Sequence, residues 1–236
     1  MGQDDTRNTY VIEIGPVPSL PVVGSDARFP VGRIYCVGRN YADHAREMGH
    51  DPDREPPFFF MKAANSVVQN NATLDYPVGT KDVHHEIELV VAIGKGGKNI
   101  PVERALDHVW GYGVGLDMTR RDLQGEAKKM GRPWEMGKSF DESAPVTALR
   151  PAAEIGHPGK GSIKLEVNGK VTQNGDLAMQ IWSVPEQISY LSHLITLQPG
   201  DLIFSGTPAG VGPVKPGDKL VGKVDGVGEL VISYKA

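Results

Sequence analysis

Short apolar and β-branched runs, separated by turns rich in glycine and proline, recur along this chain. Such runs predict β-strands, because alternate side chains of a strand face the same layer of a sheet. Asn168-Gly169 and Asp225-Gly226 each join two of these runs and predict tight hairpins. We expect strands near residues 33–37, 57–62, 84–94, 111–116, 163–167, 170–173, 201–205, 219–224 and 229–234.

Helical patterns are fewer and shorter than strand patterns. Residues 101–110 have helical spacing, and a capping signal at 119–122 predicts a helix through 129. Ser183-Val-Pro-Glu186 forms a capping box ahead of an amphipathic helix of about three turns. Strands and helices do not alternate regularly, so the fold class is α+β and mostly β rather than a doubly wound sheet.

The chain shows no internal repeat or shift in composition that would mark a second large domain. Residues 1–30 are expected to form an N-terminal tail with a short leading strand at 10–14. Residues 31–236 are then a single domain. The segment 48–57 is polar and contains three prolines, which is typical of a loop that closes over a site as a lid.

Composition excludes several classes of partner. The net charge of −4 over 236 residues gives no electrostatic reason to bind nucleic acid or an anionic membrane surface. The single cysteine, Cys36, allows no intrachain disulfide and no thiolate metal cluster, which fits a reducing compartment. The polar N-terminus is no signal peptide, and no apolar run approaches the ~20 residues that span a bilayer. We therefore expect a cytoplasmic protein.

The segment from His84 to Gly94 contains the first candidate site. Residues two apart on a strand point to the same face, so Glu86 and Glu88 should project side by side. Two carboxylates that close repel each other unless a cation or a proton lies between them. A hard divalent ion such as Mg²⁺ or Mn²⁺ suits such a pair, whereas an exposed strand end would leave both acids in water.

Asp117 is the natural third ligand, because it ends a glycine-rich strand where another group can approach closely. The three carboxylates would form an all-oxygen site with open positions, as Mg²⁺ prefers. His84 and His85 raise the alternative of zinc. Neighbouring side chains on a strand alternate in direction, so at most one of these imidazoles could join the cluster.

Two further segments could supply catalytic groups. His44 and Glu47 are three residues apart and share a face on a helical turn, where the carboxylate can orient an imidazole that activates water. The alternative is a solvated surface turn. Lys138 lies in an apolar stretch flanked by glycine, where it could neutralise an oxyanion or simply extend to the surface.

The glycine-rich segment 205–212 lacks the spacing and the lysine of a phosphate-binding loop. It remains either a cradle of backbone and hydroxyl groups for a carboxylate, around Gly206, or a plain turn. Cys36 lies within a predicted strand and is expected to pack in the core.

Several of these segments occur in an order that resembles the fumarylacetoacetate hydrolase family, in its short single-domain branch. The resemblance covers about residues 31–234 and rests on segments 35–48, 84–88, 115–124, 138–140, 167–169 and 203–212. It implies a mixed β-sandwich roll and a homodimer. It also implies that Glu86, Glu88 and Asp117 hold Mg²⁺ or Mn²⁺, with Mg²⁺ preferred.

The resemblance further assigns roles in a reaction. Positions matching His44 and Glu47 form a pair that activates water, on a helix that closes over the substrate, and the position matching Lys138 is catalytic. Positions matching Arg39 and Thr207 lie around the substrate.

Gln124 also matches a position around the substrate, and Gly206, in the same glycine-rich segment as Thr207, is expected to bind the substrate as well. A dianionic substrate would need a further cation at its distal end, and Arg120, Arg121 and Arg132 are the candidates.

The implied reaction is hydrolysis of the carbon–carbon bond of a 3-acylpyruvate, with fumarylpyruvate of gentisate breakdown giving fumarate and pyruvate. Within the same family, the alternatives are an oxaloacetate decarboxylase and an isomerase or decarboxylase of a meta-cleavage pathway. Outside enzymes, the alternative is a β-domain with a structural metal.

Overall fold

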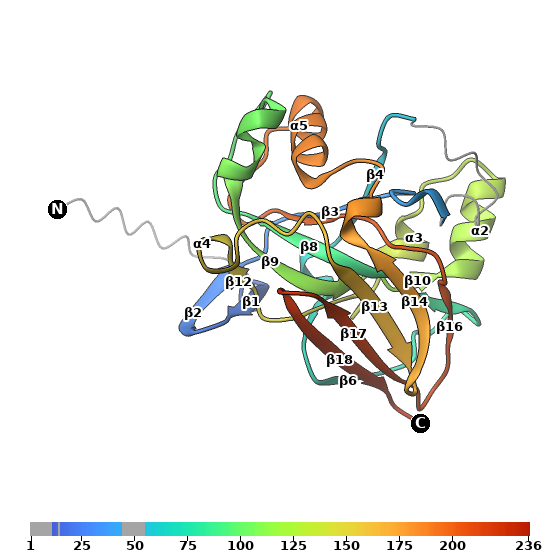
Figure 1. The fold of residues 1–236 in the computed structure, drawn as a ribbon. Helices are drawn as coiled ribbons and strands as arrows, with labels where there is room; N and C mark the ends of the chain where they lie inside the picture. Colours follow the sequence, from blue (N-terminus) through green and yellow to red (C-terminus); the bar gives the residue numbers. More distant parts are fainter. Residues whose placement is uncertain (1–10, 14, 44–54) are drawn as a thin grey trace.

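Two β-sheets pack against each other at the centre of the fold, and a small third sheet lies at one end of them (Figure 1). The structure, a computed structural model, describes residues 11–13, 15–43 and 55–236. The chain is mostly β, as expected. Within the described residues, no helix is long and apolar enough to cross a membrane.

The large sheet is mixed, because β15 runs parallel to β3 and β11 runs parallel to β5, whereas its other neighbours are antiparallel. Its strands, in spatial order, are β4 (Phe59–Lys62), β3 (Ile34–Val37), β15 (Leu202–Phe204), β8 (Ile87–Ile93), β9 (Val109–Leu116), β11 (Ala144–Val146) and β5 (Val67–Gln69), with β12 (Arg150–Pro151) also paired to β9.

The second sheet packs on one face of the large sheet. Its order is β14 (Lys170–Asp176), β13 (Ser162–Val167), β17 (Lys219–Val224), β18 (Gly228–Tyr234) and β6 (Ala72–Leu74). The hairpin of β1 (Ser19–Val22) and β2 (Ser25–Pro30) covers part of the other face, where Leu20 and Phe29 join the buried cluster around Val90 and Ala92. The small sheet has the order β10 (Thr119–Arg120), β7 (Val83–His85) and β16 (Gly212–Val214).

Helices lie outside the sheets. The α-helices are α2 (Arg121–Lys129), α3 (Glu135–Lys138), α4 (Ala152–Ile155) and α5 (Val184–Leu194), and the 3₁₀ helices are η1 (Ala64–Ser66), η2 (Val102–His108) and η3 (Leu177–Met179). The pair α2 and α3 lies beside the small sheet in Figure 1, far from α5.

Strand β8 is covered on both faces, which explains why its sequence is apolar apart from Glu88. Ile87, Leu89 and Val91 belong to the core shared with the second sheet. Val90 and Ala92 point the other way, into the cluster under the hairpin. Every residue of β8 is buried.

The large sheet and the small sheet are joined by three chain crossings that lie together. Glu86 links β7 to β8, and Asp117 begins the short link between β9 and β10. Residues 205–211 link β15 to β16. Because β8 pairs with both β9 and β15, and β7 pairs with both β10 and β16, the crossings are neighbours in space. The candidate site lies at this junction.

Most of the expected elements are present. The hairpin at Asn168-Gly169 is confirmed, with positive φ at both residues, and the capping box of Ser183 and Glu186 begins α5. The segment 84–94 is two strands rather than one, broken at Glu86. Residues 101–110 form a 3₁₀ helix that ends at His108, and not an α-helix.

The leading strand is wrongly placed by the sequence pattern. Residues 11–13 form no strand, and the first strands are β1 and β2, at 19–30. The helix predicted from the capping signal at 119–122 is present as α2 and ends at Lys129 as expected, but Thr119 does not cap it. Thr119 lies in β10, and its hydroxyl accepts a hydrogen bond from Lys138.

Candidate active site

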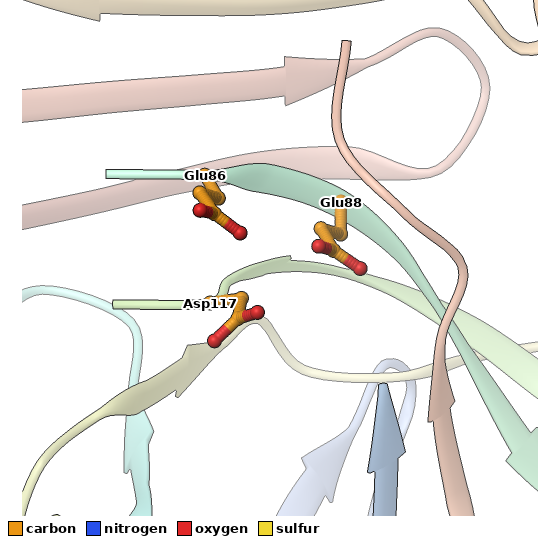
Figure 2. A group of neighbouring side chains, drawn as sticks. All are labelled: Glu86, Glu88 and Asp117. Atoms are coloured by element: carbon orange, nitrogen blue, oxygen red, sulfur yellow. The ribbon is translucent and has the colours of Figure 1, made fainter. Parts of the chain in front are cut away.

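Three buried carboxylates meet at the junction between the sheets. Glu86, Glu88 and Asp117 are 4%, 2% and 0% exposed. One oxygen of each lies within 4.8 Å of the others. Figure 2 shows the three side chains directed into a common space, with Glu88 on β8 and the other two at the strand breaks. We call these residues the carboxylate cluster.

Local backbone structure fixes the cluster. The Asp117 amide donates to the carbonyl oxygen of Glu86 at 2.8 Å, so the two strand breaks are tied together. Glu88 pairs with Gly115 across β8 and β9. A Cβ at Gly115 would lie 2.6 Å from a methyl group of Val90, so glycine here permits close packing of side chains beside the cluster.

Glu88 is buried and, among the described residues, forms no ion pair of its own, which is unfavourable for a negative charge; the nearby ammonium of Lys138 offsets this only in part. Burial, together with Asp117 and Glu86, raises the pKa of the Glu88 carboxyl well above its usual range. The amide of Gly206 donates to Glu88 Oε2 at 2.7 Å and acts in the opposite direction. A positive charge among these oxygens would restore the ionised form.

The residues fit a hard divalent cation. All three side chains offer carboxylate oxygens, which Mg²⁺ and Mn²⁺ prefer, and each can contribute one oxygen to the same centre. The raised pKa of Glu88 has the same physical origin, namely a buried negative charge that the Gly206 amide and Lys138 do not fully compensate. Neither neighbouring histidine joins them.

Cations surround the other side of the cluster. The ammonium of Lys138 donates to Glu86 Oε2 at 2.8 Å, to Asp117 Oδ2 at 2.7 Å and to the Thr119 hydroxyl at 2.7 Å. These contacts occupy all three of its hydrogens. Burial favours loss of the proton, but Asp117 and Glu86 outweigh it and raise the pKa of Lys138. A substrate oxygen bound by Lys138 must therefore replace one of these partners.

Lys62 is a second buried lysine, on β4. Its ammonium lies 2.8 Å from Asp117 Oδ1, so the two oxygens of Asp117 contact two different lysines. It also donates to the carbonyl oxygens of Met118 and Lys138. Lys62 thereby fixes Asp117 and the backbone that carries Lys138.

One pocket opens onto the carboxylate cluster. It is lined by Glu86, Glu88 and Lys138, and by four of the predicted substrate residues, namely Arg39, Arg121, Gln124 and Thr207. The structure thus brings together predicted residues from five separate segments of the chain.

Hydrogen bonds orient the polar groups of this pocket. Arg121 contacts Glu86 with one nitrogen and donates to Gln124 Oε1 with another at 2.8 Å, so the amide nitrogen of Gln124 points away from the guanidinium. Gln173 donates to the Thr207 hydroxyl oxygen at 2.8 Å. Thr207 can therefore direct its own hydrogen to another acceptor.

Gly206 serves the carboxylate cluster rather than the pocket wall. Its amide is the donor to Glu88, and its φ of 101° lies in the region that favours glycine. A Cβ at this position would lie 2.5 Å from the Cβ of Asn40. The sequence analysis expected Gly206 to contact the substrate, but Gly206 is not among the residues that line the pocket.

The comparisons with known proteins agree with this geometry. The family described as Fumarylacetoacetate (FAA) hydrolase C-terminal matches residues 33–233. The chain belongs to the fumarylacetoacetate hydrolase family. Its mostly β fold is the one found in solved structures of this family.

Two solved structures are similar over nearly the whole chain. The fumarylpyruvate hydrolase of Pseudomonas aeruginosa, in complex with Mn²⁺ and pyruvate, is 55% identical, with a TM-score of 0.95, and the match covers 96% of this chain and 99% of that one. A putative fumarylpyruvate hydrolase of Burkholderia cenocepacia is 57% identical, with a TM-score of 0.92 and coverage of 97% and 99%.

A curated relative with another activity is also similar. The mitochondrial oxaloacetate tautomerase FAHD1 of Mus musculus is 45% identical over 202 residues, which cover 86% of this chain and 91% of the relative. The chain is accordingly related to hydrolases and to isomerases of the fumarylacetoacetate hydrolase family.

The sequence analysis did not predict several residues of the site in this chain. Lys62 and Gln173 looked like an ordinary strand end and an ordinary strand residue. Lys128 lines the pocket as well. A signal for Lys128 was present, because it lies four residues after Gln124 and seven after Arg121, on the same face of a helix.

The histidines next to Glu86 have structural roles. His84 contacts Asp82 at 2.9 Å, and His85 bonds to Gln173 at 3.0 Å. Burial lowers the pKa of both imidazoles. The zinc alternative therefore receives no support from the described residues.

Of the three arginines expected to bind the distal end of a dianionic substrate, one lines the pocket and two do not. Arg121 is in the pocket, in contact with Glu86. Arg120 lies over the ring of Phe140, 4.4 Å from its centroid, and the side chain of Arg132 is 59% exposed. Neither of the last two lines the pocket. His44, Glu47 and most of the predicted lid at 48–57 lie outside the described residues.

Proposed function

We propose that this chain is a metal-dependent hydrolase that cleaves the carbon–carbon bond of a 3-acylpyruvate, with fumarylpyruvate as substrate and fumarate and pyruvate as products. The observation that carries the proposal is the single pocket that joins the carboxylate cluster to Arg121, Gln124, Lys138 and Thr207. The similarity to fumarylpyruvate hydrolases supports it. The P. aeruginosa relative was crystallised with pyruvate, the product common to all 3-acylpyruvates.

The cofactor in this proposal is Mg²⁺ or Mn²⁺, with Mg²⁺ preferred. A divalent ion held by Glu86, Glu88 and Asp117 would polarise the α-keto acid end of the substrate and stabilise the enolate that leaves when the bond breaks. The hard oxygen ligands favour both ions. The presence of Mn²⁺ in the P. aeruginosa relative is consistent with either choice.

The remaining steps belong to side chains. His44, oriented by Glu47, removes a proton from water, whose oxygen attacks the distal carbonyl carbon. Lys138 donates a hydrogen bond to the resulting oxyanion, in place of one of its present partners. The carbon–carbon bond then breaks, its electron pair remains on the enolate, and protonation of that enolate gives pyruvate.

Oxaloacetate tautomerisation or decarboxylation is the second candidate, favoured by the 45% identity with oxaloacetate tautomerase FAHD1. These reactions use the same chelating α-keto acid end but require no attacking water. An isomerase of a meta-cleavage pathway belongs to the same group of alternatives. The two candidates therefore differ in their need for a water-activating base.

His44→Ala separates the candidates. We expect wild type to release pyruvate from fumarylpyruvate with Mg²⁺ or Mn²⁺ and to lose this activity with EDTA. His44→Ala should lower fumarylpyruvate cleavage by roughly 10²- to 10⁴-fold, the usual effect of a general base, with a much smaller effect on oxaloacetate. His193→Ala, at an exposed position of α5, is the matched control.

Two results would contradict the proposal. Full fumarylpyruvate cleavage by His44→Ala would remove the role assigned to that imidazole. If wild type released no pyruvate from any 1,3-diketo acid in the presence of metal, a structural role of the metal would be favoured.

We also propose that the protein is a cytoplasmic homodimer of gentisate breakdown. Light scattering of the purified protein checks the dimer.

A further inference from the structure

One face of α2 follows the pocket outward from the carboxylate cluster. Arg121, Gln124 and Lys128 occupy positions i, i+3 and i+7 of this helix, and all three line the pocket. Seven residues of α-helix rise about 10 Å along the axis. Arg121 contacts Glu86 at the inner end, so the backbone of Lys128 lies about two helical turns along α2 from that contact.

An aromatic pair supports two cations at the outer end of the pocket. The rings of Phe58 and Trp134 pack edge to face, with centroids 5.4 Å apart. The ammonium of Lys128 lies 4.8 Å from the Trp134 centroid, and the guanidinium of Arg39 lies 5.3 Å from the Phe58 centroid. All four side chains line the pocket, and we call Arg39 and Lys128 the cationic rim.

The ammonium of Lys128 is held in positive surroundings. Burial, together with Arg121, Arg39 and Lys138, lowers its pKa to about 8, and Glu86 acts in the opposite direction. In the part of the chain that the structure describes, no carboxylate forms an ion pair with Lys128. A half-buried cation that faces a pocket without such a partner is suited to bind an anionic ligand.

We propose that Lys128, together with Arg39, binds the distal carboxylate of a dianionic substrate and so selects dianionic over monoanionic 3-acylpyruvates. This inference rests on the proposed hydrolase function and names its substrate class. Of the three arginines suggested by the sequence, Arg121 contacts Glu86 at the inner end of the pocket. Arg120 and Arg132 lie outside the pocket.

The candidate substrates differ in the separation of their two carboxylates. In fumarylpyruvate the two carboxyl carbons are separated by an extended chain of roughly 7–8 Å. In the proposed binding mode its α-keto acid end lies at the carboxylate cluster and its distal carboxylate at the cationic rim. The carboxyl carbons of oxaloacetate are only about 4 Å apart, so the longer dianion is the better candidate to contact both ends of the pocket. The edges of Phe58 and Trp134 would contact the unsaturated chain between the two ends.

The test compares Lys128→Met with Lys129→Met, because Lys129 is the neighbouring exposed lysine on the same helix. Metal-dependent pyruvate release is measured from fumarylpyruvate, a dianion, and from acetylpyruvate, a monoanion. Lys128→Met should lower kcat/KM for fumarylpyruvate by roughly 10- to 100-fold, mainly through KM, as expected for one charge-assisted hydrogen bond. The loss on acetylpyruvate should be several-fold smaller. Lys128→Arg should restore most of the fumarylpyruvate activity.

Each outcome decides the question. Equal losses on both substrates, or no loss on either, would overturn the assignment of Lys128 while leaving the hydrolase function intact. If Lys129→Met lost as much selectivity between the two substrates as Lys128→Met, the assignment would also be overturned. Wild type that cleaves neither diketo acid would instead contradict the proposed function, and with it this inference. Thermal unfolding of each variant verifies that it is folded.

Discussion

The two ends of the pocket manage charge in opposite ways. At the inner end, Glu86, Glu88 and Asp117 are almost fully buried, and two lysines and an arginine contact Glu86 and Asp117 directly. At the outer end, Arg39 and Lys128 rest on aromatic rings and are only half-buried.

Because of this difference, the removal of a charge should have different effects at the two ends. Charges at the inner end are part of the folded core, so removal of one leaves its partners buried without compensation. Charges at the outer end keep contact with water, so their removal mainly affects a bound ligand. We therefore expect inner variants to lose both stability and activity, and outer variants to change selectivity.

Asp117→Asn should produce the largest effect. Both of its oxygens contact lysines, so the neutral amide leaves Lys62 and Lys138 with less compensation at a site that is 0% exposed. Loss of one partner of a buried ion pair costs about 3–5 kcal/mol of unfolding free energy. Metal affinity and activity should fall together. Urea unfolding and Mn²⁺ titration measure the two effects.

Asp107→Asn is the control for this variant, because Asp107 forms an exposed ion pair with Arg104 on η2. It should change the unfolding free energy by less than about 1 kcal/mol. An Asp117→Asn protein as stable as wild type would show that the carboxylate cluster does not depend on its lysines.

Gly206→Ala should have the next largest effect. A Cβ would lie 2.5 Å from the Cβ of Asn40, at a φ of 101° that alanine rarely adopts. Strain and overpacking together should lower the unfolding free energy by about 3 kcal/mol. The displaced amide should also weaken its bond to Glu88, and metal affinity should decrease.

Gly159→Ala is the matched control, since its Cβ meets nothing within 4 Å and its φ is not positive. Unfolding curves and Mn²⁺ titrations of both variants provide the comparison. Normal metal affinity in a destabilised Gly206→Ala would mean that the Gly206 amide supports the fold and not the metal site.

The smallest expected effect is a pH dependence of the cationic rim. The pKa of Lys128 is lowered to about 8, so its positive charge is present below that pH and is lost as the pH rises through it. Arg121, Arg39, Lys138 and Glu86 are the charged groups that act on it. KM for fumarylpyruvate should therefore increase above pH 8, at most tenfold per pH unit.

Lys128→Arg should flatten this profile, because a guanidinium stays charged through pH 10. Initial-rate measurements between pH 6.5 and 9.5 on both proteins make the comparison. Identical KM profiles for wild type and Lys128→Arg would assign the titration to another group.

The sequence by itself determined most of the longer strands, two hairpins, the α5 cap and the identity of the three carboxylates. These features depend on local chemistry: alternation of apolar residues, turn residues with positive φ, and residue types suited to a hard metal. The family resemblance indicated Arg39, Gln124 and Thr207, and the charge of a dianionic substrate suggested Arg121; all four line the pocket with Glu86 and Glu88.

Only the tertiary structure decided how this cluster is compensated and what lies at the other end of the pocket. A buried lysine such as Lys62 and a pocket-lining one such as Lys128 look like surface lysines in sequence, because their long side chains suit either place. The break at Glu86 was likewise invisible, since it arises where β7 pairs with β10 and β16 while β8 pairs with β9. A local sequence pattern indicates which side chains are buried. Which distant segments lie next to each other is decided by how their strands pair in the sheets.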